Sequence, residues 1–264
     1  MIAPAPAKIN LALVVGPLRD DGKHELVTIF QRLDLGDRIE VEPADETTID
    51  GFAEDTIVRA ALDALEAPHG WRVRIEKHVP VAAGLAGGSS DAATALKLAN
   101  AQLAEPRELH PIAARLGADV PFFLYDGPQL GTADGTTLEP LDLPQDFVVL
   151  LLFPRGETKS STGRAYADFD ARNGADGFDE RAARLREVLA SVRRPRDLAA
   201  LPPNDLASSP HARTLVEAGA FRADVSGAGP TVYGLFHRRD DARRAAAAVR
   251  RLGRVLITIP AWYG

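Results

Sequence analysis

Several features that define common protein classes are missing from this chain of 264 residues. It contains no cysteine, which excludes a disulfide framework, a thiol nucleophile and a thiolate metal site. No run of about 18 apolar residues occurs, so a membrane-spanning helix is not expected. The first residues lack a basic segment followed by an apolar core, unlike an export signal. These absences predict a cytoplasmic protein that does not associate with a membrane.

Positive charge is also scarce relative to negative charge. The formal net charge is -6 at pH 7, and such a balance argues against nonspecific binding to nucleic acid. Hydrophobic residues nevertheless make up 45% of the chain, enough for one large core or two modest domains. This composition therefore predicts a globular protein that does not bind nucleic acid.

A glycine-rich segment, residues 80–91, is the most informative stretch of the sequence. The alternating apolar residues before it predict a strand that reaches Val79, and apolar residues with helical spacing follow it. Glycine lets a backbone approach a bulky anion, while Ser89, Ser90 and Asp91 favour a helix start, where amide groups lack helical partners. The segment therefore predicts a phosphate site, although a tight turn with a capped helix is the alternative.

Two common nucleotide-binding patterns do not fit this segment. No lysine follows Gly88, as a Walker A loop requires, and the glycines do not match G-x-G-x-x-G. The segment instead resembles the second motif of the GHMP kinases, a Gly-Leu-x-Gly/Ser-Ser-Ser loop that wraps the phosphates of ATP. This resemblance implies that the following residues bind nucleotide: Pro80, Val81, Ala82, Ala83, Gly84, Leu85, Ala86, Gly87, Gly88, Ser89 and Ser90.

Two other stretches resemble the remaining GHMP motifs, in the same order along the chain. Residues 6–11, Pro-Ala-Lys-Ile-Asn-Leu, resemble the first motif, and their alternation predicts a strand with Lys8 and Asn10 on one face. That face is either a solvated edge or a site; the resemblance implies that both residues face the phosphoryl acceptor. Residues 226–229, Ser-Gly-Ala-Gly, resemble the third motif, which implies that Gly227 approaches the phosphates, although a hairpin turn also explains them.

The string Asp-Gly-Lys-His-Glu-Leu at residues 21–26 narrows the resemblance to one GHMP subfamily. Its members phosphorylate an alcohol that carries cytidine diphosphate, in the non-mevalonate pathway to isoprenoids. The resemblance implies that His24 helps to hold cytosine, that Tyr166 stacks on the base and that Thr162 lines the same pocket. From the residues alone, His24 would be interpreted as an exposed polar residue, and Tyr166 could equally be a packing residue of a helix.

The resemblance also implies the residues of catalysis and the cofactors. Asp119 lies in Gly-Ala-Asp-Val-Pro-Phe-Phe-Leu, whose aspartate is the proposed general base of the family, although such a residue often simply ends an element. Lys8 would keep that carboxylate ionised and stabilise the developing charge. Lys77 matches a position of the adenine pocket, with a solvated lysine as the alternative. The implied cofactors are ATP and Mg²⁺, and we assign no protein ligand to the metal.

Some residues depart from the family pattern. Ala82, Ala83 and Ala86 stand where related loops usually have glycine, so any of these positions that needs φ > 0 would have to relax, at the expense of nucleotide affinity. Lys23 replaces a tyrosine that stacks on cytosine in relatives, which leaves Tyr166 as the aromatic partner.

The resemblance implies an α+β fold of two domains. Residues 1–145 would form an ATP-binding domain like ribosomal protein S5 domain 2, and residues 146–264 a ferredoxin-like substrate domain. The division precedes residues 147–153, whose continuous apolar run predicts a central strand. Two other functions remain open, namely a GHMP kinase for homoserine or a mevalonate-type alcohol, and a non-catalytic nucleotide-binding regulator.

Overall fold

The computed structural model describes residues 1–52, 57–157 and 161–261. The chain divides into two compact units whose segments alternate along the sequence. The first unit comprises residues 1–7, 35–81 and 86–126, and the second comprises residues 8–34, 82–85 and 127–264. The predicted division after residue 145 is contiguous in sequence, unlike these units, and it stays a prediction.

Two long strands, β1 (Ile2–Leu18) and β2 (His24–Ala44), each contribute residues to both units. They belong to a six-stranded sheet in which β2 lies between β4 (Gly70–Glu76) and β5 (Gln129–Ala133). The outer strands are β3 (Thr48–Asp50), parallel to β4, and β6 (Thr137–Pro140), antiparallel to β5, while β1 pairs with β2. In β4, alternate side chains are buried and exposed, as expected for a strand with one solvated face.

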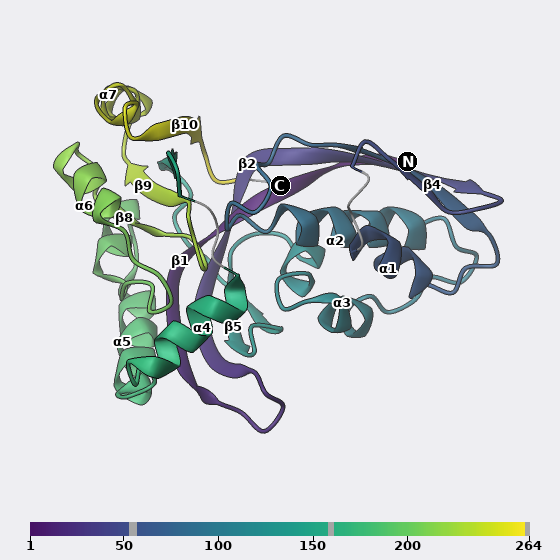
Figure 1. The fold of residues 1–264 in the computed structure, drawn as a ribbon, viewed down its shortest axis with the longest axis horizontal. Coiled ribbons are helices and arrows are strands. Elements are labelled where there is room, and N and C mark those ends of the chain that lie inside the picture. Colours follow the sequence, from purple (N-terminus) through teal and green to yellow (C-terminus); the bar gives the residue numbers. More distant parts are fainter. Residues whose placement is uncertain (53–56, 158–160, 262–264) are drawn as a thin grey trace. The chain divides into compact units, whose positions relative to one another are not determined.

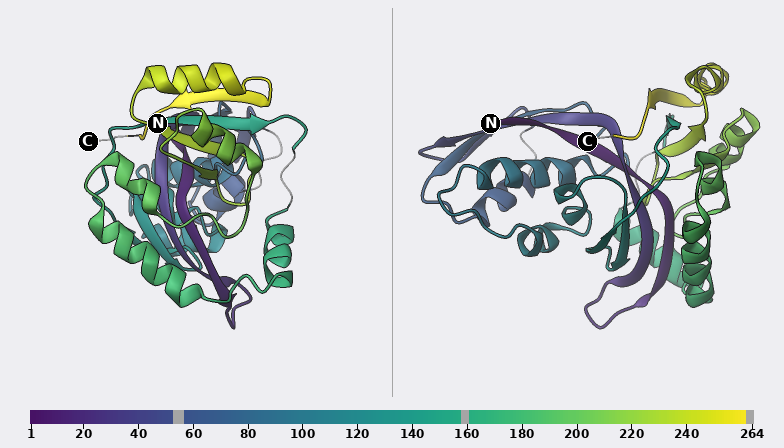
Figure 2. Two further views of the ribbon diagram at one scale, coloured as in Figure 1. Left: turned by 90° about the vertical axis from the view of Figure 1, so that its left-hand side faces the viewer. Right: turned by 180° about the vertical axis from the view of Figure 1, so that it is seen from behind.

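Helices of the first unit cover one face of its strands, as Figures 1 and 2 show. They are α1 (Ile57–Asp63), α2 (Gly87–Asn100) and α3 (His110–Leu116), followed by the short 3₁₀ helix η1 (Pro121–Leu124). Helix α2 buries Ala92, Ala95, Leu96 and Ala99, whose spacing places them on one side of a helix. Burial of this apolar side fixes the helix that follows the glycine loop.

The second unit contains a four-stranded antiparallel sheet in the order β10 (Gly253–Thr258), β7 (Val148–Pro154), β9 (Val232–Phe236), β8 (Arg222–Val225). Counted along the chain, this order is 4-1-3-2, that of a ferredoxin-like domain. Helices α6 (Pro210–Glu217) and α7 (Arg239–Val249) pack on it through a core that includes Leu150, Leu152, Leu215, Val232, Phe236 and Ala245. The predicted α+β fold and the central strand near residues 147–153 are confirmed.

The remaining elements of the second unit are α4 (Thr162–Ala171), α5 (Phe178–Ser191) and the 3₁₀ helix η2 (Pro195–Ala200). Within α4, Ala165 and Phe169 are buried in a cluster with Leu13, Val15 and Leu26, which come from β1 and β2. This packing places α4 beside the strand that carries His24. In the part of the chain that the structure describes, no helix combines the length and apolar character needed to cross a membrane.

Candidate active site

The second and third glycine motifs pack directly against each other within the second unit. Gly84 has φ +81°, and a Cβ added there would lie 2.6 Å from the Ser226 carbonyl oxygen and 2.7 Å from that of Gly229. The Ser226 hydroxyl donates to the Gly84 carbonyl at 2.9 Å, and the Thr231 amide donates to the Ala83 carbonyl at 3.3 Å. Only glycine fits at position 84 without displacing the third motif.

Helix α2 begins earlier than the sequence suggests. Its first residue is Gly87, and the N-cap, Ala86, makes no side-chain capping bond. The Ser90 amide donates to the Ala86 carbonyl at 3.0 Å, so the amides of Gly87, Gly88 and Ser89 precede the helical bonds. The predicted start at residues 89–91 is wrong, because the Ala86 carbonyl already accepts the first helical bond and the helix includes Gly87 and Gly88 in spite of the weak helix propensity of glycine. Three amides and the positive end of the helix dipole remain suited to an anion.

Two of the alanines that replace glycine adopt the conformation that favours glycine. Ala82 has φ +54° and Ala86 has φ +56°, whereas Ala83 is not among the residues with positive φ. Alanine in this region costs about 1–2 kcal/mol relative to ordinary backbone geometry. The loop therefore retains the left-handed conformation at two positions instead of relaxing, and it carries local strain.

Lys77 is held between two buried carboxylates of the first unit. Its ammonium lies 2.5 Å from Asp37 Oδ2 and 2.7 Å from Asp91 Oδ2, and its side chain is 16% exposed. The alternative of a solvated lysine is therefore wrong. The other oxygen of Asp37 accepts the backbone amides of His78, at 2.5 Å, and Val79, at 2.8 Å. Because these amides bond to a carboxylate, β4 ends at Glu76 and not at Val79 as predicted.

Burial and ion pairing act on this cluster in opposite directions. Burial raises the pKa of Asp91 to about 7, although the charge of Lys77 opposes the change. For Lys77, burial lowers the pKa, but the charges of Asp91 and Asp37 and their hydrogen bonds outweigh it and leave the pKa raised. Lys77 therefore carries its charge at neutral pH, while Asp91 titrates near neutrality.

The polar pair of the first motif is buried in the second unit. Lys8 and Asn10 are 4% and 3% exposed, so the alternative of a solvated edge is wrong. The Lys8 ammonium donates to Asn10 Oδ1 at 2.8 Å, and Asn10 Nδ2 donates to the Thr28 hydroxyl at 2.8 Å. The ammonium also lies 5.1 Å from the centre of the Phe30 ring. As predicted, Lys8 and Asn10 share a face of β1.

The third motif lies close to this pair and is fixed by a buried asparagine. Gly227 has φ +56°, and a Cβ added there would lie 3.6 Å from Asn10 Oδ1. The Asn204 side-chain amide donates to the carbonyls of Gly227, at 2.7 Å, and Val225, at 3.0 Å. The Lys8 amide donates to the Leu85 carbonyl at 3.0 Å. Parts of all three motifs are thus joined within the second unit.

His24 and Tyr166, the two residues predicted to hold cytosine, lie in contact with each other. Their rings stack with centroids 4.7 Å apart and planes 19° from parallel, and His24 Nε2 lies 2.8 Å from Asp170 Oδ1. His24 is 8% exposed, so the alternative of an exposed histidine is wrong. Tyr166 packs on the cluster beneath α4, which agrees with its alternative as a packing residue.

Lys23, which replaces the expected tyrosine, is bound to a carboxylate of the second unit. Its ammonium forms a short ion pair with Asp134. Burial acts to raise the pKa of Asp134, but hydrogen bonds from Lys23 and Thr136 outweigh it and lower the pKa to about 2. Lys23 therefore neutralises Asp134 next to the position of His24.

Two further predicted site residues lie close to the ends of helices. Asp119 occupies the turn between α3 and η1 in the first unit and is half-buried. This position is compatible with the alternative of an element-ending residue, so its role as base stays a prediction. Thr162 is the exposed first residue of α4, whose N-cap Ser161 accepts a bond from the Arg164 amide.

Four residues that contact the predicted site were not assigned to it from the sequence. Asp37 and Asp91 bind Lys77, Asp170 binds His24, and Asn204 binds the third motif. Asp37 had a signal in the sequence, because it ends the string Asp-Leu-Gly-Asp of residues 34–37. The sequence held no signal for Asp170, because its partner, His24, is distant along the chain.

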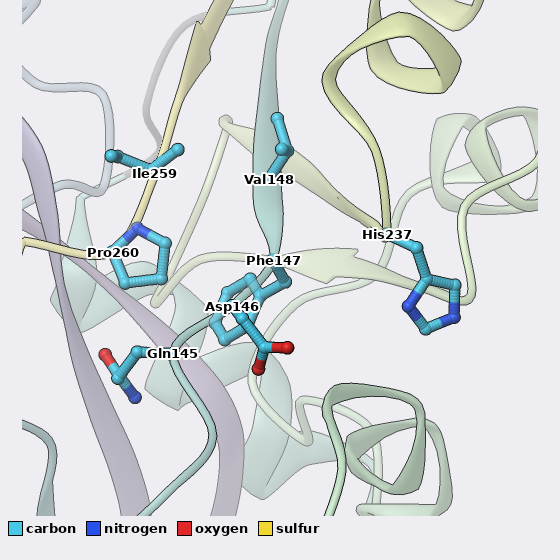
Figure 3. Close-up of a pocket in the computed structure, with 7 residues that line it drawn as sticks. All are labelled: Gln145, Asp146, Phe147, Val148, His237, Ile259 and Pro260. Carbon is cyan, nitrogen blue, oxygen red and sulfur yellow. The ribbon is translucent and has the colours of Figure 1, made fainter.

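A cavity of about 450 Å³ elsewhere in the second unit contains none of the predicted site residues. It is lined by Gln145, Asp146, Phe147, Val148, His237, Ile259 and Pro260 (Figure 3). Figure 3 shows Gln145 and Pro260 on one side and His237 on the other. Across residues 1–52, 57–157 and 161–261, no group of three or more His, Cys, Asp or Glu side chains could hold a metal ion.

Comparison with known proteins agrees with this arrangement of motifs. Models of the GHMP kinases N terminal domain and the GHMP kinases C terminal region match residues 55–127 and 208–255. The 4-diphosphocytidyl-2-C-methyl-D-erythritol kinase of Anaeromyxobacter dehalogenans (strain 2CP-C) is 38% identical, over 95% of this chain and 85% of its own length. The enzyme of that name from Rhodococcus jostii (strain RHA1) is also 38% identical, over 96% and 89%.

Solved structures give the same relationship. A crystal structure of 4-(cytidine 5'-diphospho)-2C-methyl-D-erythritol kinase matches with a TM-score of 0.79 and 33% identity, covering 99% of this chain and all of that one. The Methanococcus jannaschii mevalonate kinase matches with a TM-score of 0.69 but only 15% identity, which shows a shared fold. By the identity and coverage of these relatives, the chain belongs to the 4-diphosphocytidyl-2-C-methyl-D-erythritol kinase family of the GHMP kinases.

Proposed function

We propose that this protein transfers the γ-phosphoryl group of ATP to the 2-hydroxyl of 4-diphosphocytidyl-2-C-methyl-D-erythritol, a step of the non-mevalonate route to isoprenoid precursors. The observation that carries the proposal is the junction of the three motifs, in which Gly84 packs on Ser226 and Leu85 bonds to Lys8. This junction suits a kinase, because phosphoryl transfer requires the phosphates and the acceptor to be aligned. We also propose that the enzyme is cytoplasmic, that it is a monomer or a homodimer, and that its partners are small molecules.

The glycine loop and the start of α2 would hold the triphosphate. The amides of Gly87, Gly88 and Ser89 offer donors to phosphate oxygens at the positive end of the helix dipole. A magnesium ion bound to the nucleotide would neutralise phosphate charge, and it prefers oxygen ligands from phosphate, water and few side chains. The Ser89 hydroxyl, on the first turn of α2, is an oxygen donor that fits this requirement. Lys77 would lie in the adenine pocket.

Asp119 and Lys8 would act on the acceptor hydroxyl. The Asp119 carboxylate would accept the proton of the acceptor hydroxyl as the hydroxyl oxygen bonds to the γ-phosphorus, while the bond from that phosphorus to the bridging oxygen breaks and ADP leaves. The Lys8 ammonium, buried and bonded to Asn10, would stabilise negative charge that develops in the transition state. Asn10 would orient the ammonium and line the acceptor site.

The cytidine end would be held by His24 and Tyr166, with Thr162 beside them. Their rings are 4.7 Å apart, whereas a base inserted between two stacked rings needs roughly twice a single stacking distance. Cytosine would therefore stack on an outer face of this pair or separate it by movement of Tyr166. The imidazole of His24 would form a hydrogen bond with the base if the base replaced Asp170 as the partner of Nε2.

Steady-state assays of purified variants test the proposed roles. Asp119→Asn and Lys8→Ala should each lower kcat by a factor of about 100 or more, the usual range for loss of acid–base or charge-stabilising groups. Nucleotide binding, measured by calorimetry, should stay close to that of the unmodified enzyme. Asp126→Asn and Lys97→Ala are matched controls, because both side chains are exposed and lie outside the motifs. Turnover near the control level in either test variant would remove that residue from the mechanism.

Substrate panels test the choice of acceptor. The unmodified enzyme should consume ATP with the cytidylyl substrate and not with homoserine or mevalonate. Consumption of ATP with homoserine or mevalonate would indicate another GHMP kinase activity. Analogues with uracil or adenine in place of cytosine should react more slowly. Equal rates with all three bases would refute recognition of cytosine, and binding of ATP without turnover of any alcohol would indicate a regulator.

A further inference from the structure

We propose that Asp37 is a positioning residue of the nucleotide site. Asp37 holds the entry of the glycine loop by accepting backbone amides of residues 78 and 79, and it holds the exit, at Asp91, through Lys77. This inference rests on the proposed function, in which residues 80–90 bind ATP. Asp37 lies on β2 and is remote in sequence from the loop. Its role follows from three kinds of contact within the first unit.

At the entry of the loop, one oxygen of Asp37 fixes the backbone. Asp37 Oδ1 accepts the amides of His78 and Val79, which immediately precede Pro80. Hydrogen bonds to a carboxylate are stronger than those to a neutral acceptor. The chain therefore leaves β4 in a direction that Asp37 sets.

At the exit of the loop, the other oxygen acts through a lysine. Asp37 Oδ2 lies 2.5 Å from the Lys77 ammonium, which in turn lies 2.7 Å from Asp91 Oδ2 on α2. Asp91 is the fifth residue of α2, one turn after the amides proposed to bind phosphate. A Cβ added at Gly87 would lie 3.4 Å from Asp37 Oδ2, so the carboxylate also lies beside the first residue of the helix.

The burial of this cluster makes the arrangement rigid. The side chains of Asp37 and Asp91 are both 0% exposed. A buried ion pair that loses one partner leaves an uncompensated charge, so the arrangement resists rearrangement. One lysine and two carboxylates thus fix residues 78, 79 and 91, on either side of the proposed nucleotide-binding residues.

The variant Asp37→Asn separates positioning from a general contribution to stability. Asparagine keeps the size and one acceptor oxygen, but it directs an amide group at the Lys77 ammonium or at the backbone amides. We expect the dissociation constant for a non-hydrolysable ATP analogue and the KM for ATP to rise about tenfold, equivalent to about 1.4 kcal/mol. The KM for the cytidylyl substrate should stay within about twofold, because hydrogen bonds of this strength act locally. All measurements are made well below the thermal midpoint of the variant.

Asp34→Asn is the matched control. Asp34 begins the same Asp-Leu-Gly-Asp string but is exposed, and its substitution should leave both KM values unchanged. If Asp37 served only to stabilise the fold, Asp37→Asn would reduce kcat with the folded fraction and leave both KM values unchanged. That result would overturn the inference.

A second variant covers the case in which Asp37→Asn does not fold. Asp91→Asn removes the charged partner of Lys77 at the exit of the loop and leaves the entry unchanged. Loss of this one charged contact should raise the KM for ATP about threefold or more. The KM for the acceptor should not change. An unchanged KM for ATP would then overturn the inference. The two proposals can be told apart, because titration of the nucleotide analogue needs no acceptor. If the unmodified protein binds the analogue but does not phosphorylate the cytidylyl substrate, the proposed function is refuted and the test of Asp37 stays valid. If the unmodified protein does not bind the analogue, the proposed function and the role of Asp37 are both refuted.

Discussion

Single residues of the glycine loop carry strain that a substitution can remove. Ala86 precedes α2 with φ +56°, a conformation that glycine adopts without a steric penalty. Replacing alanine by glycine removes about 1–2 kcal/mol of strain but makes the unfolded chain more flexible, at a cost of about 0.4–1 kcal/mol. Ala86→Gly should therefore increase the free energy of unfolding by up to about 1.6 kcal/mol in urea titrations.

Ala83 provides the control within the same loop. It is buried and is not among the residues with positive φ, so glycine offers no relief there. Ala83→Gly should decrease the free energy of unfolding by about 0.5–1 kcal/mol. Equal effects of the two substitutions would contradict the assignment of strain to position 86.

The buried carboxyl of Asp91 makes stability depend on pH. Burial raises its pKa from 3.8 to about 7 in the folded state, so between about pH 4 and pH 7 the folded chain holds a proton that the unfolded chain has lost. The free energy of unfolding of the unmodified protein should therefore decrease with rising pH across this window, relative to Asp91→Asn. Urea titrations of both proteins at several pH values measure the difference. A difference that is constant with pH would show that Asp91 does not titrate there.

At the scale of elements, a buried network holds the turn between β8 and β9. Arg222 on β8 donates to the carbonyls of Leu198, Leu201 and Pro202, which lie in η2 and the segment after it. Asn204 continues this segment and accepts the amides of Leu206 and Ala207 while it donates to the third motif. The segment before α6 therefore determines where Gly227 lies.

Two substitutions of Asn204 separate its two functions. Asn204→Asp keeps the acceptor oxygen for Leu206 and Ala207 but loses the donor to Gly227 and Val225, whereas Asn204→Ala loses both. Each buried bond left unmade costs about 1–3 kcal/mol, so both variants should be less stable, and in Asn204→Asp a buried carboxylate oxygen would also face the two carbonyls without a donor. In Asn204→Asp we expect the third motif to shift, so kcat should fall while the α6 region keeps the hydrogen-exchange protection of the unmodified protein. Unchanged kcat in this variant would show that Asn204 does not determine the position of the motif.

At the scale of the whole molecule, local patterns predicted the elements better than their junctions. The apolar run of residues 147–153 and the spacing of Ala92, Leu96 and Ala99 gave β7 and α2, because burial of one face leaves a periodic signal. The pairing of Lys77 with Asp37, and the contact of Gly84 with Ser226, join residues far apart in sequence and leave no periodic trace. Resemblance to known motifs located the predicted site residues, but only the structure shows which buried partners hold them.

The two compact units should unfold together, because β1 and β2 each belong to both. Unfolding either unit alone would require breaking each long strand partway along its length and exposing its buried residues. We therefore expect a single urea transition, with the same midpoint for hydrogen exchange in peptides from residues 86–126 and from residues 161–261. A non-hydrolysable ATP analogue at 100 times its dissociation constant should stabilise both sets by about 2.7 kcal/mol. Protection of residues 86–126 alone would show that the units unfold independently, since the shared strands would then fail to couple nucleotide binding to the rest of the chain.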